Sequence, residues 1–419
     1  MKQIAILIII ILFSVSGLQG FFRDFAENPA DIGDRTSGDV ILPVFYFQGG
    51  FANNNLSMSD MNMFEEDHVL TDSEKDLLSS SDLNFTGYGK INLLAFGFKN
   101  WEIGINSHIR GNLSDFDQEF MEIVLTGNSA ESYQTTALSD SYMYQFIKIN
   151  FDWAYPQGLN LASLPVVRIS NKESGGFVLG LEEVLNYMRE MDIYLGARVN
   201  YYNSSGYAEV LESSQNFTTS EDSLYVDNHF KAVYTGTDTL NMGGNNAFGF
   251  GLGLKCELPD GWFYFSVDDL GAQLTYSDLH YNEYINNHID YLDFIDEDHQ
   301  EIDGSETVEN EKYDEDVILK LDPSITVGAE YNLGKGFDVM AKYRSCDYRL
   351  DGFFLGTTYR PVEWFPLKLT YGNGDVDSYA FKFGFDTESF EIMFGMTSYN
   401  GLFNGAKGYG GDFGIKFKF

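Results

Sequence analysis

The sequence is poor in cysteine, proline and basic residues. Its 419 residues include 2 Cys, 8 Pro and 26 Lys+Arg against 63 Asp+Glu, for a formal net charge of −37. Two cysteines exclude a disulfide-dense scaffold. The shortage of Lys and Arg excludes nucleic acid as a partner, because phosphates are neutralised by clustered cations. It also argues against docking on anionic lipids through a polybasic patch.

Long apolar runs are missing after residue 20. Residues 1–20 are typical of a secretory signal peptide, with Lys2 before an apolar run from Ile4 to Phe13. An uncleaved membrane anchor is the alternative, but about 10–12 apolar residues are short for a span that needs about 20. We therefore expect an exported chain in which residues 21–419 form one domain.

What the chain has instead is a repeated alternation of apolar and polar residues. Because successive side chains of a strand point to opposite faces, this period predicts strands with one apolar and one polar face. Aromatic residues, 16% of the chain, are prominent on the apolar faces. The clearest segments are 103–110, 193–201, 248–258, 325–333, 367–371, 379–385, 390–396 and 413–419.

These segments and the short turns between them predict an all-β fold, a transmembrane antiparallel up-and-down β-barrel of about 14 strands. With their flanking residues these segments run to about 9–11 residues, the length that a tilted membrane strand needs. The last strand ends on Phe419, in register with its apolar face. This ending is typical of outer-membrane barrels, so the expected partners are outer-membrane lipid and, through Phe419, the barrel-assembly machinery. A soluble β-sandwich or propeller explains the alternation but neither the signal peptide nor Phe419.

Residues 53–82 do not alternate, and we predict that they form a plug or gate. Residues 70–78 favour a short helix and begin with capping signals. On a barrel such a helix packs inside the lumen or outside at a rim, and the sequence leaves both open. The candidate gate residues of this segment are Asp72, Glu74 and Asp76.

Three further segments are irregular. Residues 116–125 and 179–191 carry apolar residues at helical spacing. Residues 277–320 are crowded with Asp and Glu and predict a solvated extracellular loop. The spacing of an EF-hand is absent there, so we predict no metal site.

Motifs of enzymes and cofactors are missing. The chain has no nucleophile elbow, Walker loop, H-E-x-x-H or Cys-x-x-Cys pattern, so we predict neither an enzyme nor a cofactor. The glycines of 249–253 lie in an alternating strand, which excludes a Rossmann loop and favours a bend of the wall or the close approach of a plug. Cys256 and Cys346 fall on opposite faces of the wall and are predicted to stay unbonded.

Basic residues gather on the polar strand faces, which should point into the lumen. They either pair with acidic plug residues or create a field that favours anionic solutes or the carboxylate head of an amphipathic ligand. The sequence leaves both interpretations open. The lumen-lining candidates are Arg110, Arg198, Lys255, Lys342, Arg344, Arg360, Lys368 and Lys382.

Two local motifs resemble one family. Asn28-Pro29-Ala30 resembles the Asn-Pro-Ala element near the mature N-terminus of FadL/TodX-like outer-membrane transport barrels. The Gly-rich strand from Phe248 to Leu254, followed by Val267 to Gly271, looks like a strand pair of uncharacterised FadL-related outer-membrane proteins of diderm bacteria.

This resemblance implies an outer-membrane barrel that admits a small hydrophobic or amphipathic solute, with Asn28, Pro29 and Ala30 at an inner gate. A non-transporting surface barrel, acting as a secretion or attachment scaffold for a partner protein, is the alternative.

Overall fold

The computed structural model describes only part of the chain. Asn28, Phe419, the expected signal peptide and the helix predicted at 179–191 lie outside that part, as does most of 116–125. The described residues are 29–32, 40–57, 59–60, 63, 69–80, 82–98, 100–116, 118, 121–122, 132–135, 138, 140–155, 159–160, 192–219, 224–235, 246–258, 260–286, 305–374, 376–387 and 389–418.

Fourteen of the described strands form a closed ring. Each pairs antiparallel with the next, and the last pairs with the first. The predicted 14-strand antiparallel β-barrel is therefore confirmed. In order around the ring, the strands are β1 (Val40–Asn53), β2 (Leu83–Phe98), β3 (Trp101–Phe116), β5 (Tyr142–Ala154), β7 (Asp192–Thr219), β9 (Asn246–Leu258), β10 (Gly261–Leu270), β15 (Ser324–Gly334), β16 (Phe337–Ser345), β17 (Gly352–Val362), β18 (Phe365–Asn373), β19 (Ser378–Asp386), β20 (Phe390–Tyr399) and β21 (Gly408–Lys418).

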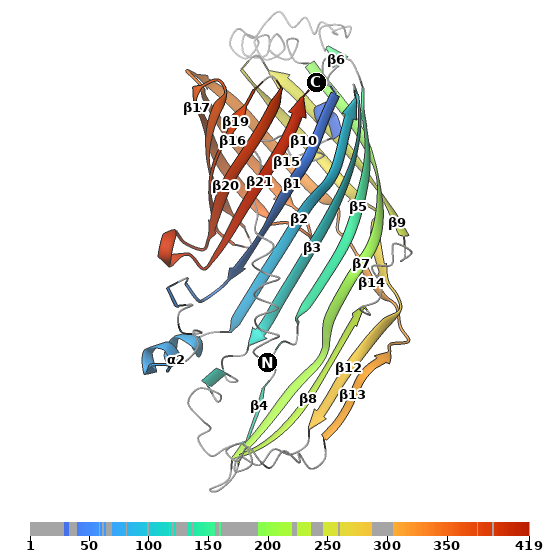
Figure 1. Cartoon of the computed structure of the whole chain (residues 1–419), viewed down its shortest axis with the longest axis vertical. Helices are drawn as coiled ribbons and strands as arrows, with labels where there is room; N and C mark the ends of the chain where they lie inside the picture. The colour runs from blue at the N-terminus through green and yellow to red at the C-terminus, as the bar shows by residue number, and fades with distance from the viewer. Residues whose placement is uncertain are drawn as a thin grey trace, which may run out of the picture.

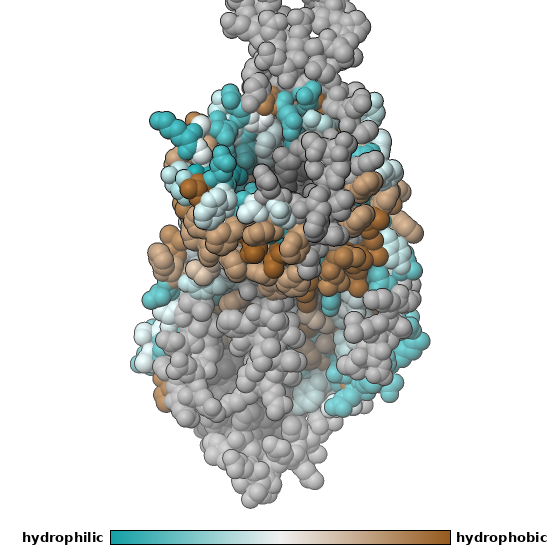
Figure 2. All heavy atoms as spheres, turned by 45° about the horizontal axis from the view of Figure 1, so that its top comes forward, coloured by the Kyte–Doolittle hydropathy of each residue, from teal (hydrophilic) through white to brown (hydrophobic). Residues whose placement is uncertain are grey.

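The apolar faces of these strands point outward. In β9, Phe248, Phe250 and Leu252 are 58–59% exposed, while Gly249 and Gly251 between them face inward against other side chains. Figure 2 shows hydrophobic residues gathered in a band across the visible face, with hydrophilic residues at the rim above it. Soluble monomers rarely expose so large an apolar surface.

The two ends of the barrel differ. Short turns join β2 to β3, β9 to β10, β15 to β16, β17 to β18 and β19 to β20 at one end, at the top of Figure 1. All 4 tryptophans lie near this end, at positions 101, 153, 262 and 364. Trp101 packs on Phe151 with ring centroids 4.8 Å apart, and Phe337 stacks on Tyr359 at 4.3 Å. Such aromatic girdles mark the interface between a membrane and water.

The opposite end carries an extension of the sheet. Strand β7 is 28 residues long, and its second half pairs with β8 (Leu224–Thr235) beyond the part that pairs with β9. Strand β12 (Leu279–Asn286) pairs with β8, and β13 (Ser305–Lys312) pairs with β12 (Figure 1). On the other side, β4 (Ser132–Thr135) pairs with the far end of β7. Residues 277–320, predicted to form a solvated extracellular loop, contain β12 and β13, and β12 continues the sheet from β8.

Two helical segments have different surroundings. Helix α2 (Asp72–Leu78) lies at the rim beside the start of β2 (Figure 1), where Leu78 packs with Leu56 and Leu83. The 3₁₀ helix η1 (Pro29–Ile32) packs against β5, β7 and β9. The remaining elements are β6 (Leu159–Asn160), the paired β11 (Gln273–Tyr276) and β14 (Val317–Lys320), and η5 (Phe403–Gly405).

No helix within the described ranges is long and apolar enough to cross a membrane.

Candidate functional site in the barrel lumen

Two adjacent carboxylates enter the lumen at the end of β10. In a regular strand neighbouring side chains face opposite ways, but Asp268 and Asp269 together oppose the single residue Gly251 of β9. Asp269 has a φ of 61°, which an extended strand does not allow. This bulge leaves Asp268 7% and Asp269 0% exposed, so both carboxylates point inward.

Cations from β5 and β7 neutralise this pair. Lys148 Nζ lies 2.8 Å from Asp268 Oδ2 and 2.6 Å from Asp269 Oδ1. Arg198 donates to Asp268 Oδ2 at 2.6 Å and to both carboxylate oxygens of Asp152, at 2.5 and 3.0 Å. Arg198, which was predicted to line the lumen, is buried, and its partners are carboxylates of the barrel wall. Because buried charges are tolerated only when they are paired, removal of one member should leave a costly unpaired charge.

Neutral side chains complete the ion cluster, which we define as Lys148, Asp152, Arg198, Asp268 and Asp269. Asn200 Nδ2 donates to Asp268 Oδ1 at 2.7 Å. Tyr202 donates its hydroxyl to Asp269 Oδ1, and Tyr348 donates to Asp269 Oδ2 at 2.6 Å. Tyr348 comes from a loop rather than from a barrel strand, so the ion cluster ties that loop to the wall.

This loop, Cys346 to Asp351 between β16 and β17, folds into the barrel, and we call it the lumen loop. Cys346, Tyr348 and Leu350 are 3–8% exposed. Three wall side chains hold its backbone. The donors and acceptors are Tyr144 Oη to Asp347 O at 2.9 Å, Arg110 Nη1 to Arg349 O at 3.0 Å, and Arg344 Nη2 to Leu350 O at 2.7 Å.

Aromatic residues fill the space around the lumen loop. Tyr348 meets Phe146 edge to face with ring centroids 5.3 Å apart, and it meets His108 in the same way at 4.6 Å. Leu274 and Tyr276 of β11 join the same buried cluster, so the connection between β10 and β15 also contributes to the filling. The described lumen is therefore occupied on the side of β5 and β7.

The predicted inner gate is partly described. Ala30 is fully buried, and Pro29 is also buried. A Cβ at Gly196, on the lumen face of β7, would overlap the backbone of Pro29 and Ala30. Glycine at this position therefore lets η1 lie directly on the wall, the kind of close approach that glycine permits.

The other predicted lumen cations also have partners on the wall. Lys255 Nζ lies 2.8 Å from Glu257 Oε1, and Arg360 pairs with Asp338. Arg360 is only half-buried, near a short turn. The remaining cations, Lys342, Lys368 and Lys382, are 0–8% exposed on inward faces.

The predicted acidic gate residues lie elsewhere. Asp72 and Asp76 are exposed on α2 at the rim. Glu74 accepts hydrogen bonds from Thr71 N and Thr71 Oγ1, both at 2.7 Å, and so caps its own helix. The interpretation that these residues pair with the lumen cations is not supported. Arg198, Lys255 and Arg360 pair with carboxylates of the wall, and Arg110 and Arg344 donate to the lumen loop.

Sequence reasoning missed most of the ion cluster and the whole lumen loop. Strict alternation from Phe263 through Phe265 and Val267 would put Asp269 on the apolar face. A carboxylate on that face was the available signal for a bulge. The lumen loop gave a weaker signal in the sequence. Its Tyr348 is an aromatic residue in a short connection between two strands.

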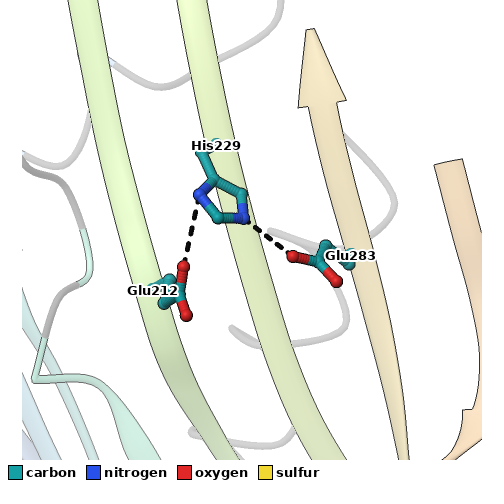
Figure 3. A group of neighbouring side chains, drawn as sticks. All are labelled: Glu212, His229 and Glu283. Carbon is teal, nitrogen blue, oxygen red and sulfur yellow. Dashed lines mark hydrogen bonds and ion pairs between the residues drawn. The ribbon is translucent and has the colours of Figure 1, made fainter. Parts of the chain in front are cut away.

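A second group of ionisable residues lies in the extension (Figure 3). His229 Nδ1 faces Glu212 Oε2 at 3.2 Å, and its Nε2 faces Glu283 Oε1 at 2.9 Å. One ligand atom from each of these three residues lies within 4.8 Å of the others, so the group is one that could hold a metal ion. The hydrogen bond from His229, together with one from Lys231, holds the pKa of Glu283 below its usual value despite opposing desolvation. The two cysteines, Cys256 and Cys346, are free, as predicted.

Comparisons with known proteins find one matching family model and several similar solved structures. A model described as "Family of unknown function (DUF5723)" matches residues 175–397, more than half of the chain. No curated protein matches significantly. The P. putida toluene transporter TodX is 8% identical over 94% of this chain and 91% of its own, with a TM-score of 0.40. A Pseudomonas aeruginosa FadL homologue is 8% identical over 94% of this chain and 93% of its own, with a TM-score of 0.39. The CymD monoaromatic hydrocarbon channel is 9% identical over 94% of this chain and 90% of its own, with a TM-score of 0.40.

Proposed function

Since the chain belongs to the DUF5723 family, whose function is unknown, we propose that it is an outer-membrane channel for a small hydrophobic or amphipathic solute. In the conformation described above, the lumen loop closes the channel. The observation that carries this proposal is a closed barrel whose lumen holds a loop tied to the wall by side chains of β3, β5, β10 and β16.

The outer surface of the barrel favours a location within a membrane. Closure of the ring gives each of its fourteen described strands two neighbours, and in lipid every backbone polar group needs a partner. The outward faces are apolar, and aromatic residues gather near the end with the short turns. Short turns face the periplasm in barrels of this kind, so the extension and the lumen loop would lie on the extracellular side.

The polar wall of the lumen favours a channel through which solutes pass over a purely structural core. Its wall is polar and carries Lys and Arg on many strands. An inward loop held by a few hydrogen bonds can be released without breaking the barrel, whereas a wall strand cannot. We propose no enzymatic activity for this lumen.

Solute flux through the reconstituted protein tests the proposal. The test variant replaces the lumen loop by a two-residue Asn-Gly turn, which suits a β-hairpin. The matched control deletes residues 402–405 at the same end, where Leu402 and Phe403 are 52% and 81% exposed. We expect liposome swelling with small sugars and amino acids to rise strongly for the loop variant and to stay at the wild-type level for the control. Equal swelling in all three proteins would contradict the proposal.

A non-transporting surface barrel is the second candidate. The observation that favours it is the extension of β7, β8, β12 and β13, which projects beyond the barrel and carries Glu212, Glu283, Glu309 and Glu311. Under this alternative, neither the wild type nor the loop variant would conduct, and deletion of the extension would abolish the attachment of a partner at the cell surface.

A further inference from the structure

The lumen contains a cavity that the ion cluster does not use. It has a volume of about 240 Å³ and lies between the lumen loop and the ends of β1, β2 and β3. Its lining residues come from seven separate parts of the chain, so the fold as a whole builds it. The residues used below are Gly50, Tyr88, Arg110, Asn112, Val376 and Tyr399.

One half of the cavity is aromatic and aliphatic. Tyr88 and Tyr399 are 7% and 1% exposed, and their hydroxyls lie 2.8 Å apart. Both rings belong to a buried cluster that also contains Leu350, with Val376 packed against it. A Cβ at Gly50 would overlap the ring of Tyr399, so glycine is needed there to let this ring form the wall.

The other half offers hydrogen-bond donors. Arg110, whose half-buried side chain lines this half, carries a permanent positive charge and donates one hydrogen bond to Arg349 O. Thr86 donates to Asn112 Oδ1 at 3.0 Å, which turns the amide NH₂ of Asn112 toward other acceptors. A guanidinium and an amide donor together suit a carboxylate, because hydrogen bonds between charged partners are stronger than those between neutral ones.

The volume limits the apolar part of a ligand. An apolar cavity of about 150 Å³ binds benzene. A space of about 240 Å³ therefore holds one substituted ring, whereas a long acyl chain has several times as many heavy atoms as benzene and would not fit.

We propose that this cavity binds a small aromatic carboxylate, with the carboxylate at Arg110 and Asn112 and the ring against Tyr88 and Tyr399. The proposal rests on the proposed function, since it names the solute class that the channel admits. A chain of net charge −37 would repel such an anion at long range, so the half-buried guanidinium of Arg110 supplies the local attraction that makes binding selective.

Calorimetry with benzoate on the detergent-purified full-length protein tests the site without requiring conductance. Benzamide, which has the same shape and no charge, is the ligand control. We expect benzoate to bind about 10- to 100-fold more tightly than benzamide, because a hydrogen-bonded charge is worth more than a neutral pair. Arg110→Gln should abolish this preference.

Two further variants keep the outcome interpretable. Val376→Trp fills the cavity and leaves Arg110 in place, so it should abolish benzoate binding without releasing the lumen loop. Arg360→Gln removes a lumen arginine that pairs with Asp338 away from the cavity, and it should bind benzoate like the wild type. Heat-modifiable mobility on gels confirms that each variant forms the barrel.

The outcomes separate this proposal from the channel. Equal affinity of the wild type for benzoate and benzamide, or unchanged benzoate binding in Arg110→Gln and Val376→Trp, overturns the cavity assignment even if solutes pass. Selective benzoate binding that both variants lose supports the site, and an absence of flux in the same preparations would then count against the channel alone.

Discussion

Removal of a single hydroxyl, by Tyr348→Phe, should loosen the lumen loop. The Tyr348 hydroxyl donates to Asp269 Oδ2 at 2.6 Å and lies 3.1 Å from Lys148 Nζ. Among the four wall contacts of the lumen loop described above, it is the one that reaches a carboxylate. The phenylalanine ring retains the edge-to-face contacts with Phe146 and His108, so the change is confined to the hydrogen bond.

The magnitude follows from the environment of that bond. A hydrogen bond to a charged group is worth about 1.5–3 kcal/mol. Asp269 keeps its bonds from Lys148 and Tyr202 in the variant, so the lower end of this range applies. About 1.4 kcal/mol corresponds to a tenfold change in an equilibrium constant. The ratio of open to closed channels should therefore rise about tenfold, provided that the loop is the gate.

Single-channel recording in planar bilayers measures this ratio as the open probability. Tyr343→Phe is the matched control, because Tyr343 is 48% exposed on the outer face of the wall, whereas the loop is buried in the lumen. An open probability of Tyr348→Phe equal to those of the wild type and the control would refute the assignment of the lumen loop as a gate.

Three other perturbations have defined outcomes. Gly196→Val should displace η1 from the wall, because the valine side chain would overlap Pro29. We expect a rise in leak current for this variant and no rise for the control Leu195→Ala. Arg198→Met should lower barrel stability by about 3–5 kcal/mol, because it leaves buried carboxylates unpaired. The urea midpoint of heat-modifiable mobility measures this loss, and adding Asp152→Asn should restore part of the stability. The Glu283 contact in the extension should persist below the usual glutamate pKa of about 4.3 and be lost as the pH falls further, because a lowered pKa stabilises only the ionised form. Protease susceptibility of β12 should then rise with acid in the wild type and be high at every pH in Glu283→Gln.

The wall of the barrel was predictable because its signal is local. Alternation of apolar and polar residues is visible within about ten residues, and lipid on one side and lumen on the other enforce it along each strand. Phe248 and Arg198 were assigned to the correct faces on this basis alone.

The contents of the lumen were not predictable in the same way. Asp269 faces inward only because the bulge opposite Gly251 adds one residue to β10. The partners of Tyr348 lie in β5 and β10, far away in the sequence. The strands within residues 277–320 were not predicted, because acidic composition usually indicates solvated loops, whereas β12 is held by its backbone pairing with β8.

The most direct test of the central claim compares neighbouring positions on β18. Leu369 is 56% exposed on the outer face and Thr370 is 8% exposed on the lumen face. With both native cysteines replaced by serine, Leu369→Cys and Thr370→Cys are reconstituted and treated with a maleimide confined to the bilayer. Labelling of position 369 and protection of position 370 are the expected results. Labelling of position 370 by this reagent, or rapid labelling of position 369 by a charged, water-soluble maleimide, would contradict a lipid-facing wall around an enclosed lumen.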